Sequence, residues 1–147
     1  MAAAKKDIYF LAVKVFLCKG GSLFICKDSF GHWDLPGGRI IASEFKTRLE
    51  KIVERKMKEE LGLGLRYTLG KPVLFMRHER KESMPGGRKK ARIFAIGYEA
   101  KYVGGEIKLS NRHTNCLWVP VKKLNPKKYF RGGWLHGVEE YLRLIRK

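Results

Sequence analysis

The chain contains the stretch Trp33-Asp34-Leu35-Pro36-Gly37-Gly38-Arg39 and, further on, the stretch Arg55-Lys56-Met57-Lys58-Glu59-Glu60-Leu61-Gly62-Leu63. The first stretch is typical of a proline-glycine turn, which exposes backbone carbonyl oxygens, and the second is typical of the charged end of a helix. Carbonyl and carboxylate oxygens are the ligands that magnesium-like cations prefer. Together the two stretches predict a site for a divalent cation and for substrates that carry phosphates.

The residues before the second stretch predict a helix from about Arg48 to Leu61. The segment Thr47 to Glu50 has the form of a capping box, and Gly62 supplies a stop. An apolar stripe along this helix is made by Leu49, Ile52, Val53, Met57 and Leu61. At about 100° per residue, Lys56 and Glu60 interrupt the stripe. Because a buried charge needs a partner, each must pair with the other, with another side chain or with a bound ion.

The spacing of these residues resembles the Nudix box, Gly-x5-Glu-x7-Arg-Glu-U-x-Glu-Glu-x-Gly-U, in which U is aliphatic. The matching residues are Gly38, Glu44, Arg55, Met57, Glu59, Glu60, Gly62 and Leu63. Two features depart from the motif. Ten residues, Phe45 to Glu54, separate Glu44 from Arg55 where the motif has seven, and Lys56 replaces the first glutamate. The resemblance implies one domain, residues 1–147, with an α/β/α sandwich in which a mixed β-sheet lies between helices.

The resemblance also implies roles for the box residues. The carbonyl of Gly38 and the carboxylates of Glu59 and Glu60 would hold Mg²⁺ or Mn²⁺, while Glu44 and Arg55 would brace the loop against the helix. Lys56 cannot ligate a cation while it is protonated, and it repels one placed beside it. We therefore expect fewer ions than in a complete box, with Lys56 contacting a substrate phosphate or neutralising a carboxylate. A site that has lost catalysis is the alternative.

The segment Ser110 to Trp118 resembles a loop of one Nudix branch, the GDP-mannose mannosyl hydrolases, whose box is also incomplete. A histidine in that loop supplies the base, and His113 matches it. Arg112 stands where the branch has a metal-binding glutamine, so that ligand is not carried over. His113 is the first candidate for the general base, because imidazole ordinarily titrates near working pH. Glu59 is the second candidate.

Basic side chains near the turn predict contacts with phosphate. Arg39 follows the double glycine and, with Lys56, would hold a diphosphate. Arg77, with its neighbours His78 and Arg80, would line the same pocket, although an exposed strand edge is an equal alternative. We expect Trp33, Phe75 and Tyr98 either to stack on a nucleotide base or to lie in the core. The expected function is metal-dependent hydrolysis of a nucleoside diphosphate linked to another moiety, such as a nucleotide sugar.

The net charge of the chain favours anionic partners but does not indicate which anion binds. Lys and Arg outnumber Asp and Glu by 32 to 14, which gives a net charge of +18 and a field that attracts nucleotides, nucleotide sugars and RNA. The alternative function is a Nudix-fold module that binds RNA or a nucleotide without turnover, and a homodimer also stays open. The chain shows no signal core and no apolar run of membrane-spanning length, so we expect a cytoplasmic protein without a membrane partner.

The remaining pattern predicts the other elements of the domain. β-Branched and aromatic runs bounded by glycine or proline predict strands at Ile8–Cys18, Leu23–Cys26, Pro72–Arg77, Ala91–Tyr102, Glu106–Leu109 and Cys116–Val119. Apolar residues recur at three- and four-residue steps from Trp134 to Ile145, which predicts a final helix packed on the sheet. Three cysteines without a Cys-x-x-Cys spacing are expected to be core residues rather than a disulfide frame or a zinc site.

Overall fold

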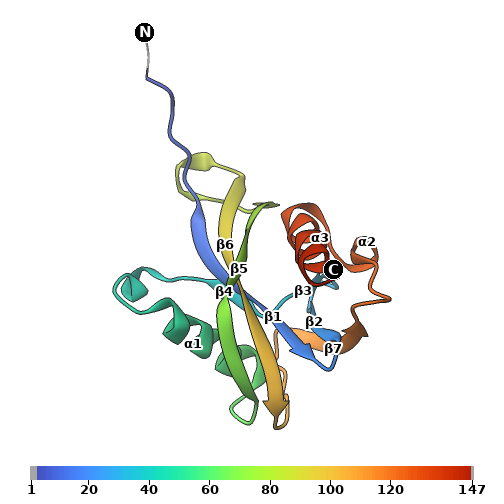
Figure 1. The fold of residues 1–147 in the computed structure, drawn as a ribbon. Helices are drawn as coiled ribbons and strands as arrows, with labels where there is room; N and C mark the ends of the chain where they lie inside the picture. Colours follow the sequence, from blue (N-terminus) through green and yellow to red (C-terminus); the bar gives the residue numbers. More distant parts are fainter. Residues whose placement is uncertain (1–2, 147) are drawn as a thin grey trace.

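The computed structural model describes residues 3–146, and within them the strands form one mixed sheet (Figure 1). The strands are β1 (Phe10–Lys19), β2 (Ser22–Asp28), β3 (Trp33–Asp34), β4 (Gly37–Arg39), β5 (Arg66–Lys81), β6 (Lys90–Gly104) and β7 (His113–Pro120). The helices are α1 (Leu49–Leu61), α2 (Pro126–Tyr129) and α3 (Gly132–Ile145), with short 3-10 turns at Ala42–Glu44 and Pro85–Gly87. No helix within residues 3–146 combines the length and the apolar character needed to span a membrane.

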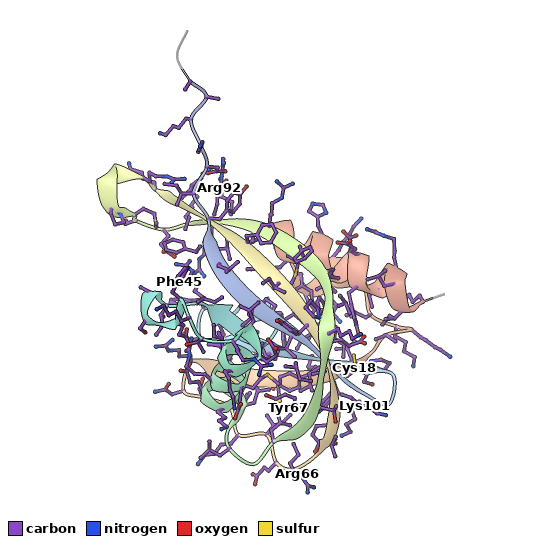
Figure 2. All side chains as sticks on the ribbon, turned by 60° about the vertical axis from the view of Figure 1, so that its left-hand side comes forward. Cys18, Phe45, Arg66, Tyr67, Arg92 and Lys101 are labelled. Carbon is purple, nitrogen blue, oxygen red and sulfur yellow. The ribbon has the colours of Figure 1, made fainter. Side chains whose placement is uncertain are left out.

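The sheet has the order β3-β2-β1-β6-β5, with β4 paired to β1 and β7 paired to β2. Strands β1 and β6 run parallel through the middle, and their register pairs Phe10 with Ile93 and Cys18 with Lys101. The other pairings are antiparallel. Figure 2 shows Arg92 at the end of the sheet where the N-terminal segment departs, and Cys18 and Lys101 together at the other end.

Helices cover both faces of this sheet, as Figure 1 shows for α1 on one side and α3 on the other. The apolar stripe of α1 packs on Val13, Val15 and Phe24, and the apolar face of α3 packs on Phe16 and Met76. Because β1 is buried on both faces, it is apolar along most of its length, with Lys14 as an exception, as strands between two layers are. The predicted α/β/α sandwich with a mixed sheet is confirmed.

Helix α1 has almost the predicted bounds but not the predicted cap. Its N-cap is Arg48, whose side chain makes no capping hydrogen bond, so the capping box predicted for residues 47–50 is wrong. Thr47 lies one residue before the N-cap. Its amide belongs to the preceding turn, where it donates to the carbonyl of Glu44, 2.9 Å away. Phe45, in that turn, is exposed (Figure 2). Gly62 ends the helix with a φ of +89°, as predicted.

The segment predicted as a strand at Glu106–Leu109 has no strand structure, so this prediction is wrong. Its amides instead cap the end of α1: Lys108 donates to the carbonyl of Leu61 at 2.9 Å, and Ser110 donates to that of Glu60 at 3.0 Å. The last carbonyls of a helix have no partner within the helix, and here a passing segment satisfies them. This contact brings the start of β7, and His113 with it, beside the box helix.

Close backbone contact fixes α3 against β5. A Cβ on Gly133 would lie 1.7 Å from the carbonyl oxygen of Arg77, and a Cβ on Gly137 would lie 2.3 Å from the side chain of Met76. Only glycine permits this approach, because any side chain would push the helix away from the strand. The first turn of α3, which carries Trp134, is therefore set directly on the strand that carries Arg80.

Candidate active site

A pocket of about 520 Å³ lies where β1, β4, the end of α1, β5 and the first turn of α3 meet. Its cationic lining residues are Lys14, Arg39, Arg55, Lys56, Arg80 and Arg112. Its acidic lining residues are Asp34, Glu59, Glu60 and Glu82. The two stretches that the sequence singled out thus line one cavity, and positive side chains from several elements surround it. Such a cavity favours anionic ligands.

The glycine turn is pressed against the central strand. Gly37 has a φ of +136°, and a Cβ there would lie 2.1 Å from the carbonyl oxygen of Val13. Antiparallel pairing places Gly38 opposite Val13 and Gly37 opposite Lys14. The amide of Gly37 then donates to Oε1 of Glu60, 2.8 Å away. One hydrogen bond therefore ties the turn to the last turn of α1.

Glu44 and Arg55 join the loop before α1 to the helix. Nε and Nη2 of Arg55 each donate to a different Glu44 oxygen at 2.6 Å, and the amide of Ile41 donates to the same carboxylate at 3.1 Å. Hydrogen bonds from Arg55 lower the pKa of Glu44, and burial opposes them. Arg55 also donates to Oε1 of Glu59 at 2.9 Å. This fork geometry holds the loop and orients Glu59.

The carboxylate of Glu60 is half-buried beneath the turn. Burial raises its pKa, while the amide of Gly37 and the charges of Lys14, Lys56 and His113 oppose the rise. Glu59, one residue earlier, is more exposed, and the hydrogen bond from Arg55 is the largest of the effects that lower its pKa. The two adjacent carboxylates therefore differ in their ease of protonation. Such a difference separates a group that can exchange a proton from one that stays charged.

Lys56 points into the pocket rather than into solvent. Its side chain is 13% exposed, whereas that of Lys58, two residues along the same helix, is 55% exposed. Nζ of Lys56 lies 3.3 Å from Oε2 of Glu59, and a Cβ on Gly38 would be 2.7 Å from that nitrogen. Within residues 3–146, Lys56 forms its ion pair with Glu59 and not with Glu60, so of the partners that the sequence left open for Lys56, another side chain is the one observed.

The donor atoms predicted for Mg²⁺ or Mn²⁺ do not fit a divalent ion in this arrangement. Both oxygens of Glu59 already accept from cations, one from Arg55 and one from Lys56. Lys56 also lies beside Gly38, where the predicted carbonyl ligand belongs. At an effective dielectric of about 20, a divalent ion 4 Å from an ammonium meets roughly 8 kcal/mol of repulsion. In the described part of the chain, no group of three or more His, Cys, Asp or Glu is placed to hold a metal.

Arg39 and Arg77, the two arginines predicted to bind substrate, differ in their position relative to the pocket. Arg39 lines the pocket, and its Nη1 and Nη2 donate to the carboxylate of Glu82 at 2.8 and 2.7 Å. Arg77 is exposed and does not line the pocket. Arg80 lines it instead, because side chains alternate along β5 and these two residues face opposite sides of the sheet. The structure therefore brings Arg39 and Lys56 together with the box, but not Arg77.

His113 lies at the start of β7, next to the box helix but outside the pocket lining. Its Nδ1 is 3.0 Å from Oγ of Ser110, and its charge acts on the carboxylate of Glu60. Arg112, immediately before it, does line the pocket. The structure thus places the predicted base close to Glu60, with Arg112 facing the cavity.

Sequence reasoning missed a polar cluster whose residues Lys14, Asp34 and Trp134 line the pocket. Lys14 is 5% exposed, its Nζ donates to both oxygens of Asp34 at 2.9 Å, and it lies 4.9 Å from the ring centroid of Trp134. His78 stacks on the same ring at 4.5 Å and accepts a hydrogen bond from the amide of Gly133. The available signal was Lys14 itself, because a lysine within an apolar strand needs a buried acidic partner.

The aromatic residues expected to stack on a base lie elsewhere. Tyr98 is in the core under α1, Phe75 is 62% exposed, and Trp33 packs edge-on against Tyr129. None of the three lines the pocket, so the core alternative holds for Tyr98. Among the cysteines, Cys26 is buried in the core, and Cys18 and Cys116 pack partly buried against it.

Comparison with known proteins finds relatives that are similar in sequence and many solved structures with a similar fold. No family profile matches the chain. Nucleoside triphosphatase NudI of Escherichia coli O139:H28 is 28% identical over 112 residues, which cover 71% of this chain and 77% of that protein. The MutT protein from Methanosarcina mazei Go1 superposes with a TM-score of 0.68 at 21% identity, covering 98% of this chain and 99% of its own.

Two enzymes with phosphate-containing substrates also share the fold. An ADP-ribose pyrophosphatase from Streptococcus suis has a TM-score of 0.66 at 16% identity, with 95% of this chain and 94% of that one covered. The E. coli dihydroneopterin triphosphate pyrophosphohydrolase has a TM-score of 0.69 at 12% identity, with 95% and 100% covered. The chain is thus similar in sequence to NudI over 71% of its length, and it shares its fold with these solved structures.

Proposed function

We propose that the protein hydrolyses a pyrophosphate bond in a nucleoside diphosphate that carries a further group. The observation that supports this most is the cation-lined pocket at the junction of the glycine turn and α1, tied by the hydrogen bond from Gly37 to Glu60. The similar proteins include a nucleoside triphosphatase and an ADP-ribose pyrophosphatase, whose substrates share phosphoanhydride chemistry. A nucleotide sugar or a related pyrophosphate compound is the proposed substrate class.

The chain's own residues supply binding and orientation of the diphosphate. Lys56, Arg80 and Arg112 line the pocket with positive charge, and each would stabilise charge that develops on phosphate oxygens. Arg39 pairs with Glu82 through one N–H of Nη1 and one of Nη2, and its remaining N–H groups would donate to phosphate oxygens. Glu44 and Arg55 would hold the loop in place.

A base must remove a proton from the attacking water while the oxygen of the water bonds to phosphorus and the bridging P–O bond breaks. His113 is the proposed base. With Nδ1–H donating to Ser110, its Nε2 would keep a free lone pair for that proton. Glu59 is the second candidate, although Arg55 and Lys56 lower its pKa and so weaken it as a base.

The predicted requirement for Mg²⁺ or Mn²⁺ is not used in these steps, because Gly38, Glu59 and Glu60 do not fit a divalent ion while Lys56 lies among them. In other phosphate-transferring enzymes, such an ion bridges phosphate oxygens and stabilises developing charge. The assay for this protein is therefore run with Mg²⁺, with Mn²⁺ and with EDTA. Similarity to the GDP-mannose mannosyl hydrolase branch stays a prediction.

The test is product release from a panel of nucleotide sugars, ADP-ribose, dinucleoside polyphosphates, nucleoside triphosphates and capped RNA. We expect turnover of at least one phosphoanhydride substrate, and we expect His113→Gln, which removes the proposed base, to reduce it by about 100-fold or more. His136→Gln is the matched control, since His136 is an exposed histidine on α3, outside the pocket. Absence of turnover across the panel in all three conditions would refute the proposal.

The alternative function is a module that binds a nucleotide or RNA without turnover. It is favoured by one observation, the lysine at the place of a box glutamate, because Lys56 disturbs the predicted metal ligands. Tight binding of a ligand from the same panel, together with no product, would support this alternative. Salt dependence would then separate RNA, which contacts many cationic side chains, from a single nucleotide.

A further inference from the structure

The position of the Lys56 ammonium matches the position expected of a cation cofactor. It lies beside Gly38 and pairs with Glu59, and its charge also acts on Glu60. These are the three residues predicted to ligate Mg²⁺ or Mn²⁺. The side chain is held inward, since it is 13% exposed while the neighbouring Lys58 is 55% exposed. A positive charge is therefore already built into the place where the family resemblance puts an ion.

The local charges explain why a cation is needed there. Glu59 and Glu60 would repel the phosphates of a ligand that enters this pocket, and Arg55 is already engaged by Glu44 and Glu59. A cation between the carboxylates and the phosphates removes this repulsion. An ammonium has three N–H donors, and the contact with Glu59 uses one of them. The other two are free to donate to phosphate oxygens, as charge-assisted hydrogen bonds.

We propose that Lys56 takes the place of a divalent cation in this pocket, so that the protein binds a diphosphate without a metal ion. This inference rests on the proposed function, because it concerns the same site and the same ligand class. The ammonium bridges Glu59 and the phosphates as an ion would, but it is carried by the helix itself. Phosphate recognition by this chain is consequently insensitive to chelators, and the site does not recruit Mn²⁺.

The first test measures binding of α,β-methylene-ADP by calorimetry in EDTA and again with excess Mg²⁺. The methylene bridge of this probe cannot be hydrolysed, so turnover does not interfere. We expect the two dissociation constants to agree within about threefold. We expect Lys56→Met to weaken binding in EDTA by about 10- to 100-fold, the usual loss of charge-assisted hydrogen bonds. Lys58→Met, which removes an exposed lysine from the same helix, leaves the affinity unchanged.

The second test follows Mn²⁺ directly by electron paramagnetic resonance, which needs no activity. The natural chain should leave Mn²⁺ free, and Lys56→Glu should create a site that binds it, because it restores a carboxylate where the ammonium stood. Thermal unfolding of Lys56→Met, Lys56→Glu and Lys58→Met checks that all three remain folded. Lys56→Arg, which keeps the positive charge, should restore most of the affinity that Lys56→Met loses.

The outcomes separate this inference from the proposed function. Binding that strengthens tenfold or more with Mg²⁺, stoichiometric Mn²⁺ in the natural chain, or no binding of the probe in either condition overturns the inference. Chelator-insensitive binding that depends on Lys56 supports it, even where the substrate panel yields no product. Hydrolysis that requires Mg²⁺, with binding that also requires it, would leave the proposed function standing and remove the role given to Lys56.

Discussion

Replacing Gly37 by alanine tests how the glycine turn is held against the central strand. The new Cβ would lie 2.1 Å from the carbonyl oxygen of Val13 and 2.9 Å from Cα of Lys14, and both contacts are with backbone. The φ of +136° adds strain for any residue with a side chain. The turn must therefore move away from β1, and its amide then leaves the carboxylate of Glu60.

The expected cost is the sum of two effects. Forcing alanine into a positive-φ conformation costs about 1–2 kcal/mol, and losing a hydrogen bond to a half-buried carboxylate costs about 1.5–3 kcal/mol. We expect the free energy of unfolding to fall by about 2.5–5 kcal/mol, which for a domain of this size lowers the melting temperature by roughly 5–20 °C. Urea unfolding followed by circular dichroism measures it.

Gly86→Ala is the matched control. Gly86 has a φ of +81°, and a Cβ there meets nothing within 4 Å, so it carries the conformational strain without the backbone clash. We expect Gly86→Ala to cost about 1–2 kcal/mol. Equal destabilisation by the two substitutions would refute the reasoning, because the contact with Val13 would then have no energetic consequence.

Three further substitutions probe the rest of the site. Glu44→Gln should lower stability by about 2 kcal/mol at neutral pH, because it weakens a two-point contact with Arg55 that is partly screened by solvent, and urea unfolding at pH 7 would show this. Burial raises the pKa of Glu60 in the folded state. The protonated carboxyl therefore contributes to stability at pH values below the pKa of Glu60 in the unfolded chain. This contribution is lost as the pH rises through the pKa of Glu60 in the folded chain. Glu60→Gln should flatten this part of the stability curve at pH values above the ordinary glutamate pKa of 4.5, and an unchanged curve would contradict the burial of that carboxylate. Gly133→Ala should lower the melting temperature by about 5 °C or more by separating α3 from β5; a fall in near-ultraviolet dichroism from Trp134 would report the separation, and a variant as stable as the natural chain would argue against the close approach.

Much of the fold could be predicted from local pattern. The helix bounds followed from the apolar stripe and from Gly62, since a 3.6-residue period and a glycine stop are properties of the segment itself. Strand β5 extends further at both ends than predicted, because its pairing with β6 continues to Arg66, opposite Gly104, and to Lys81, opposite Lys90. The Nudix spacing indicated that Gly37–Gly38 and Glu60 would meet, and the Gly37–Glu60 hydrogen bond joins them.

The predictions were wrong where the structure of a segment depends on contacts with residues that are distant in sequence. Residues 106–109 have strand-like composition, yet their amides pair with the carbonyls of α1 because those carbonyls have no other partner. Arg77 and Arg80 look equivalent in sequence, but the pairing register of β5 with β6 decides which of them faces the pocket. When both faces of a strand hold charged residues, its own sequence does not show which residues face the pocket.

The sequence by itself determined the box, its spacing, the surplus of positive charge and the identity of the departure at Lys56. Only the tertiary structure decided where that lysine goes, since its pairing with Glu59 and its place beside Gly38 depend on a turn from another part of the chain. The same holds for Lys14, which is stable in the core because Asp34 and Trp134 reach it from β3 and α3. Local pattern encodes elements through short-range periodicity, whereas a site's electrostatics are set by side chains that folding alone brings together.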